Sequence, residues 1–102
     1  MDRIAMLQEI LQQNPTGPLA RYSLALEFSN SGRIEEALRE FDSLLKSHSE
    51  YTPGYFMAAQ TLARAARHDE ARNMLAAGIA CAERTGNQHA KAEMEAMLEE
   101  LG

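Results

Sequence analysis

The sequence predicts an all-α fold of about six helices, built from a two-helix unit that repeats along the chain. Apolar residues recur at spacings of three and four, which is typical of amphipathic helices. Ala37 and Phe41 lie one helical turn apart, and the same pair recurs further along the chain as Ala71 and Leu75. The composition is poor in aromatic residues and rich in Ala, Leu and Glu, which favours helix over sheet.

The first two helices are expected over residues 2–13 and 18–30. The first presents an apolar face made of Ile4, Leu7, Ile10 and Leu11. Pro15 cannot continue this helix, whereas Pro18 suits the first turn of the next, where its missing N–H costs nothing. Gly32 then offers a left-handed cap that ends the second helix.

Four further helices are expected over residues 34–47, 53–66, 69–84 and 88–101. Thr52 is interpreted as the N-cap of the fourth helix, followed by Pro53 in its first turn. Gly86 and Asn87 provide a stop and a restart, with the glycine as C-cap of the fifth helix and the asparagine as N-cap of the sixth.

The 34-residue period that separates the two pairs extends beyond them. Leu7, Phe41 and Leu75 share one register and are all large and apolar. In another register a glycine, Gly78, follows two large residues, Ile10 and Leu44. A helix pair that repeats at this period can bury its apolar surface only by stacking on copies of itself.

These residues make the chain resemble the tetratricopeptide repeat family, in the small form found in bacteria, whose unit is a 34-residue helix–turn–helix. The resemblance implies a right-handed superhelix of antiparallel helix pairs, with residues 1–102 as one domain. The expected parts are a half repeat, two full repeats and a half repeat or capping helix, over residues 1–17, 18–51, 52–85 and 86–102. Two departures stand out: Arg21 replaces the usual Trp, and Gly78 replaces a packing residue.

No constellation for catalysis, metal binding or cofactor binding is recognisable. The three histidines, His48, His68 and His89, are far apart in the sequence and lack the close spacing of metal ligands. Cys81 is the only cysteine, and it is expected to be a small packing residue rather than a nucleophile. The protein is therefore expected not to be an enzyme and to need no cofactor.

Charge and hydropathy limit the partners. The net charge of −5 argues against nucleic acid, because phosphate binding needs a basic surface. No signal peptide is recognisable, and no segment approaches the roughly 20 apolar residues of a membrane span. With a single cysteine, the simplest expectation is a cytoplasmic protein with no membrane partner.

The resemblance implies a protein or peptide partner. In stacked helix pairs the first helices line a concave groove. Mapping the family's groove positions onto this chain selects Tyr22, Leu26, Ser29, Phe56, Gln60, Arg64 and Met94. The leading hypothesis is a scaffold that binds a peptide or helix, with Tyr22, Leu26 and Phe56 as anchors. Family members that clamp a carboxylate use Lys and Asn where this chain has Tyr22 and Leu26, so a carboxylate clamp is not implied.

Two alternatives remain open at this point. The last helix can fold into the groove and cover Tyr22 and Phe56, which would make both residues plain core. The chain can also form a homo-oligomer by stacking its terminal helices, with Ile4, Leu7, Ile10 and Leu11 as the candidate surface.

Overall fold

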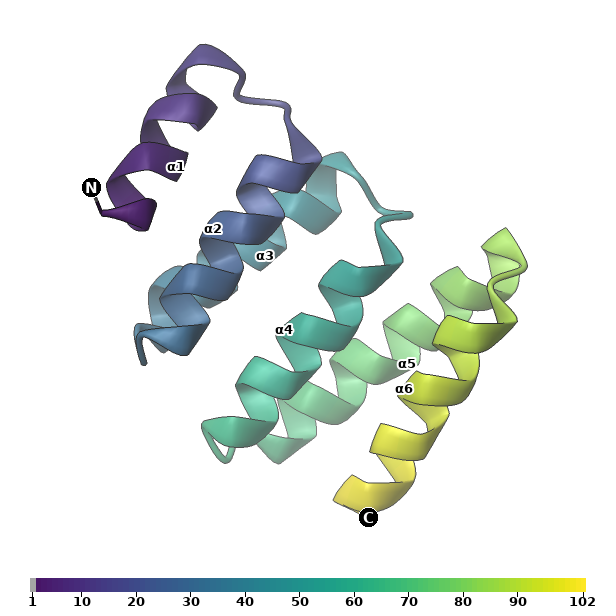
Figure 1. The fold of residues 1–102 in the computed structure, drawn as a ribbon. Helices are drawn as coiled ribbons and strands as arrows, with labels where there is room; N and C mark the ends of the chain where they lie inside the picture. The colour runs from purple at the N-terminus through teal and green to yellow at the C-terminus, as the bar shows by residue number, and fades with distance from the viewer. Residues whose placement is uncertain (1) are drawn as a thin grey trace.

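A computed structural model describes residues 2–102, which form six helices and no strand (Figure 1). The helices are α1 (Arg3–Gln13), α2 (Pro18–Asn30), α3 (Ile34–Ser47), α4 (Thr52–Arg64), α5 (His68–Thr85) and α6 (Gln88–Leu101). Each predicted helix is present, and the observed helix ends lie close to the predicted ones. The all-α prediction is confirmed.

The helices stack as a helical repeat with two layers (Figure 1). The pairs α2–α3 and α4–α5 are antiparallel hairpins that pack side by side through α3 and α4. In Figure 1, α2, α4 and α6 lie in front, with α3 and α5 behind them. Additional contacts join α4 to both α2 and α6. One layer therefore consists of first helices, and this layer carries the candidate site described below.

The core follows the period of the repeat. Leu7, Phe41 and Leu75 occupy equivalent places and are all buried, and Phe41 exposes only 1% of its surface. Phe41 belongs to a cluster that also contains Leu24 and Phe28 from α2. A second cluster joins α4, α5 and α6. The interdigitation of these apolar rows between neighbouring pairs is what makes the pairs stack.

The turns inside the two helix pairs share one backbone geometry but differ in sequence. Gly32 has φ +77°, and Ala66, its equivalent in the next repeat, has φ +62°. The following N–H donates to a carbonyl of the preceding helix in both turns, Arg33 to Phe28 and Arg67 to Leu62, each at 2.9 Å. Glycine adopts this left-handed conformation without strain, whereas alanine does not. Because the left-handed residue interrupts the helix, α4 ends at Arg64 rather than at Ala66.

Exchanging the two turn residues should change stability in opposite directions. We expect Ala66→Gly to raise the free energy of unfolding by about 0.5 kcal/mol, because relief of strain exceeds the added entropy of the unfolded chain. Gly32→Ala should lower it by about 1 kcal/mol for the converse reason. Urea denaturation of both variants measures the changes, and a loss of stability in Ala66→Gly would contradict this account.

Of the two predicted N-terminal caps, one is confirmed and one is wrong, whereas both predicted glycine turns, at Gly32 and Gly86, adopt the left-handed conformation. Asn87 caps α6, since its side-chain oxygen accepts a hydrogen bond from the Ala90 N–H at 3.1 Å. Thr52 does not cap α4, because the helix already begins at Thr52 and its hydroxyl donates to the Glu50 carbonyl at 3.3 Å. Thr52 is buried, and its hydroxyl lies 3.8 Å from the sulfur of Cys81.

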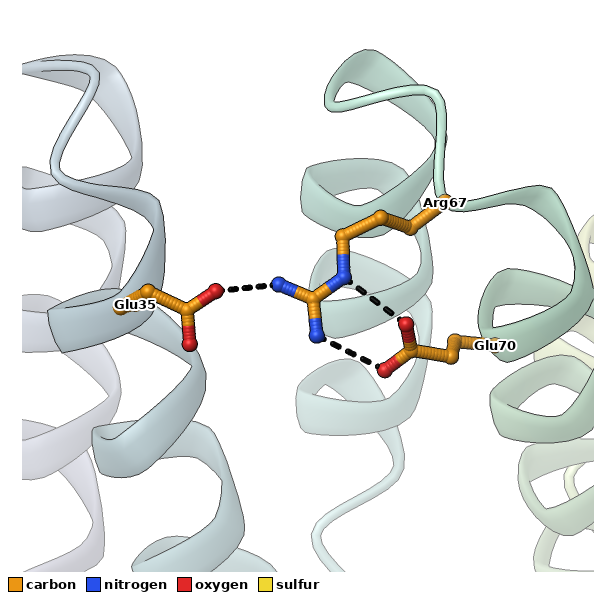
Figure 2. Close-up of polar contacts among 3 residues, drawn as sticks. All are labelled: Glu35, Arg67 and Glu70. Carbon is orange, nitrogen blue, oxygen red and sulfur yellow. Dashed lines mark hydrogen bonds and ion pairs between the residues drawn. The ribbon is translucent and has the colours of Figure 1, made fainter.

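Ion pairs connect neighbouring helices on the surface. Figure 2 shows the Arg67 guanidinium bound through two nitrogens to Glu70 of α5, at 2.8 and 2.9 Å, and through a third to Glu35 of α3. Hydrogen bonding to Arg67 holds the pKa of the Glu70 carboxyl below its usual value. Arg21, which stands at the usual Trp position, pairs with Glu40 of α3 at 2.7 Å. Arg67 thus links the two helix pairs, and Arg21 links the two helices of the first pair.

Gly78 has a packing role that its place in the sequence pattern does not suggest. A Cβ atom added to Gly78 would lie 2.6 Å from the Cβ of Tyr55 and 2.5 Å from the sulfur of Met94. The glycine therefore lets α4 and α6 approach α5 closely at one point. The larger residue that the repeat pattern calls for is replaced here by side chains from two neighbouring helices.

Candidate functional site: a pocket between the first helices

A pocket of about 240 Å³ opens between α2, α4 and α6. Its lining, called the groove pocket below, consists of Tyr22, Thr52, Pro53, Phe56, Met57, Asn87, His89, Ala90, Glu93 and Met94. Most of these side chains are apolar or aromatic, and the polar ones lie mainly on α6 and the turn before it. Two of the three predicted anchors, Tyr22 and Phe56, line the groove pocket.

The repeat pattern explains why a pocket forms here. Tyr22, Phe56 and Ala90 occupy equivalent places in successive repeats and come from α2, α4 and α6. Two of these equivalent positions carry an aromatic ring, whereas the third carries only a methyl group. The small side chain of Ala90 therefore leaves space beside Phe56 that a third ring would fill. Tyr22 and Phe56 both remain half-buried.

Tyr22 is held in place by a second tyrosine from the turn before α4. The ring centroids of Tyr22 and Tyr51 lie 5.3 Å apart with an angle of 49° between the planes. This separation is within the range of favourable aromatic pairs. Burial, and then the neighbouring Tyr51, raise the pKa of the Tyr22 phenol above its ordinary value, which favours the uncharged form of the ring.

The α6 side of the groove pocket carries a carboxylate. Glu93 lines it with a side chain that is 53% exposed. Its Oε1 lies 3.4 Å from Nε2 of His89, one turn earlier on the same helix, which is an ion pair only when the imidazole is protonated. The side chain of Asn87 is already used as the cap of α6. Glu93 is thus the acidic group of the pocket.

Ser29 does not lie on the surface of the groove as predicted. Its side chain is buried and hydrogen-bonds to Arg64 and Thr61, both on α4. Arg64 donates to the Ser29 hydroxyl at 2.7 Å, Ser29 donates to Thr61 at 2.8 Å, and Thr61 donates to the Met57 carbonyl at 2.8 Å. Ser29 therefore connects α2 to α4, and its hydroxyl is used inside the protein.

Met94 is also placed differently from the prediction. Its exposed fraction is 0%, and it packs with Tyr55 and Leu75 in the second core cluster. It forms the base of the groove pocket rather than an anchor on its surface. Leu26 and Gln60 are half-buried residues of α2 and α4 that lie outside the pocket lining, and they extend the same layer away from it.

The last helix does not fill the groove. α6 packs on α5 and contacts α4, but among the described residues no Cα atom of α6 lies within 8 Å of one in α2. It follows the α4–α5 pair as a further first helix would (Figure 1), and its residues line one part of the groove pocket. Tyr22 and Phe56 therefore remain at the surface of the groove, and the alternative in which α6 covers both is wrong for this structure.

Most of the apolar face of α1 that was predicted to self-associate is buried within the chain. Leu7 and Leu11 are buried in the first core cluster because α1 packs on α2, and Ile4 packs partly against the same cluster. Ile10 remains 43% exposed. The apolar face of α1 thus points into its own chain rather than toward a second copy.

Several pocket residues were not among the predicted site residues, and Met57 and Glu93 are two of them. Met57 directly follows Phe56, and Glu93 directly precedes Met94, so both are next to a predicted groove position on their helix. A prediction that also included the neighbours of each groove position on its helix would contain both residues. Which neighbour reaches the pocket depends on the tilt between successive pairs, which the sequence pattern does not specify.

Two further features bear on function: clusters of metal-binding side chains and helices able to span a membrane. Within residues 2–102, no group of three His, Cys, Asp or Glu side chains is arranged to bind a metal ion. None of the helices that the structure describes combines the length and the hydropathy needed to cross a membrane.

Comparison with known proteins supports the fold through solved structures. No family model and no curated protein matches the chain. A tetratricopeptide repeat domain protein from Salinibacter ruber, solved by NMR, is 27% identical with a TM-score of 0.80, over 86% of this chain and 89% of that protein.

Two chaperone structures are similar at lower identity. PcrH, solved in complex with the chaperone binding region of PopD, is 18% identical with a TM-score of 0.87, over 96% of this chain and 74% of PcrH. The type III secretion translocator chaperone SycD from Yersinia enterocolitica is 14% identical with a TM-score of 0.85, over 96% of this chain and 68% of SycD. The chain is a small tetratricopeptide-repeat-like protein.

Proposed function

We propose that this protein is a non-enzymatic scaffold that binds a peptide or helical segment of a partner protein along the groove of α2, α4 and α6. Tyr22 and Phe56 serve as its apolar anchors, and Leu26, Gln60 and Arg64 continue the binding surface along the groove. In this proposal the partner is a protein, no cofactor is needed, and neither nucleic acid nor a membrane is bound. The lone, buried Cys81 is compatible with the reducing cytoplasm as its location.

The observation that carries the proposal is the groove pocket with its two half-buried aromatic rings. Its volume of about 240 Å³ is below the roughly 300–1,000 Å³ of pockets that enclose whole small molecules. A pocket of this size suits one side chain of a larger partner. Aromatic residues are enriched in protein interfaces, and tyrosine is among the residues that most often dominate binding energy.

The similar structures give independent support for a protein partner. PcrH was solved with a segment of another protein, PopD, and SycD is described as a translocator chaperone. Both share the fold of this chain at low identity, so the support concerns the class of partner and leaves its identity open. The adaptable thioether of Met57, beside Phe56, suits an apolar ligand.

Replacing Phe56 with alanine should weaken peptide binding by about tenfold or more, since a central aromatic anchor contributes more than about 1.4 kcal/mol. Peptides selected from a random phage-displayed library on the wild-type protein provide the ligands, and fluorescence anisotropy measures their affinity. The free energy of unfolding should fall by only about 1 kcal/mol, because Phe56 is half-buried.

Leu38→Ala is the matched control, since Leu38 is a half-buried apolar residue that lines a hollow between α3 and α5. It should leave peptide affinity unchanged. Equal loss of affinity in both variants, or amide chemical-shift changes confined to α3 and α5 when peptide is added, would place binding on another face and overturn the proposal.

Self-association through the terminal helices is the alternative role, and it has less support. The exposed large apolar residues near the N-terminal end are Ile10 and Leu19, whereas Leu7 and Leu11 are used inside the chain. Sedimentation velocity over a range of concentrations distinguishes the two roles, because a scaffold of the kind proposed sediments as a monomer throughout.

A further inference from the structure

We infer that the groove pocket accepts a lysine or arginine side chain, flanked by apolar residues, from the bound peptide. This inference deepens the proposed function and rests on it, since it specifies which kind of side chain enters the pocket. Three features of the described residues support it: the aromatic rings, the position of Glu93 and the absence of lysine and arginine from the lining.

The aromatic rings provide the first feature. Tyr22 and Phe56 border the pocket from α2 and α4, and both rings are uncharged and half-buried. The face of such a ring carries partial negative charge and attracts an ammonium or guanidinium group within about 6 Å. The long methylene stem of lysine or arginine also packs well on apolar surface such as that of Met57 and Pro53.

Glu93 provides the second feature. It lines the same pocket from α6, whereas the rings come from α2 and α4, and its side chain is 53% exposed. Apart from His89, whose Nε2 lies at 3.4 Å, no ion-pair partner of Glu93 occurs in residues 2–102. A cation bound beside the rings and this carboxylate would interact favourably with both. A purely apolar side chain would instead remove water from the Glu93 carboxylate without replacing the lost hydrogen bonds.

The third feature is that no lysine or arginine of the described chain competes for the pocket. The pocket lining within the described chain contains no lysine or arginine. Lys91, on α6, pairs with Glu83 at 3.4 Å, and Arg64, on α4, donates to Ser29 at 2.7 Å. The net charge of −5 also favours approach of a basic segment over an acidic one.

Selection of a random phage-displayed peptide library on three proteins tests this inference: the wild type, Glu93→Gln and Glu95→Gln. Glu95 is an exposed residue of α6 outside the groove pocket, so the two variants have the same net charge and differ only in the pocket. We expect the wild type and Glu95→Gln to enrich peptides with Lys or Arg at one fixed place among apolar residues. Glu93→Gln should enrich apolar peptides without that basic position.

Affinity measurements on a selected peptide give the second readout. Replacing its basic residue with Met should weaken binding to the wild type about tenfold, and to Glu93→Gln by less than about twofold. Peptides that shift the amide signals of α2, α4 and α6 but show no basic preference would overturn this inference and leave the scaffold proposal in place. Equal basic enrichment in Glu93→Gln would also overturn it. If no selected peptide shifts the signals of these helices, the proposed function itself fails.

Discussion

Phe41→Ala should lower the free energy of unfolding by about 4 kcal/mol, in the range measured when a fully buried phenylalanine is truncated. Phe41 is 1% exposed and packs in one cluster with Phe28 of α2 and Ala58 of α4, so its ring contributes to two helix pairs. Removing it leaves a cavity at the interface between the pairs. The loss is a large part of the roughly 5–15 kcal/mol that stabilises a typical domain.

Urea denaturation followed by circular dichroism measures this loss. Leu38→Ala serves as the reference, because Leu38 lies on the same helix and is only half-buried. It should lose about 1 kcal/mol. Similar losses in both variants would show that the first core cluster is not organised around Phe41.

Gly78→Leu should lower the free energy of unfolding by about 3 kcal/mol, although it introduces the large apolar residue that the repeat pattern calls for. The first atom of the new side chain already lies 2.6 Å from the Cβ of Tyr55, which cannot rotate away, and 2.5 Å from the sulfur of Met94. Better helix propensity returns only about 1 kcal/mol. The clash therefore outweighs the gain in propensity.

Ala77→Leu is the matched control for this substitution. Ala77 is the neighbouring residue of α5 and is exposed, so the same leucine meets solvent there. Its effect should stay within about 0.5 kcal/mol of zero. A thermal midpoint of Gly78→Leu equal to that of Ala77→Leu would show that α4 and α6 can move apart without cost, contrary to the packing described.

The helices and their stacking could be predicted because both follow from local chemistry and a fixed period. The turns at Gly32 and Gly86 and the cap at Asn87 depend on a few adjacent residues. Thr52 has the right chemistry for a cap, but its hydroxyl lies near Cys81 of α5, which is distant in the sequence. The sequence around Thr52 contains no sign of that contact.

The candidate site could be predicted only in part, for a similar reason. Tyr22 and Phe56 follow from the repeat register and line the pocket. Whether a residue in the same layer reaches solvent depends on its neighbours on other helices. Ser29 is buried by its bonds to Thr61 and Arg64, and Met94 is buried because Gly78 leaves room for its sulfur.

The packing of α1 has a consequence for local unfolding. Among the described helices, α1 is the one that packs on a single neighbour, α2, whereas α6 at the other end packs on both α5 and α4. In a linear array the free energy of opening a terminal unit depends on the interfaces that it loses. Residues 3–13 therefore need the smallest free energy of local opening. Exchange of their amide hydrogens with solvent reports the detachment of α1 while the helices that line the pocket stay folded.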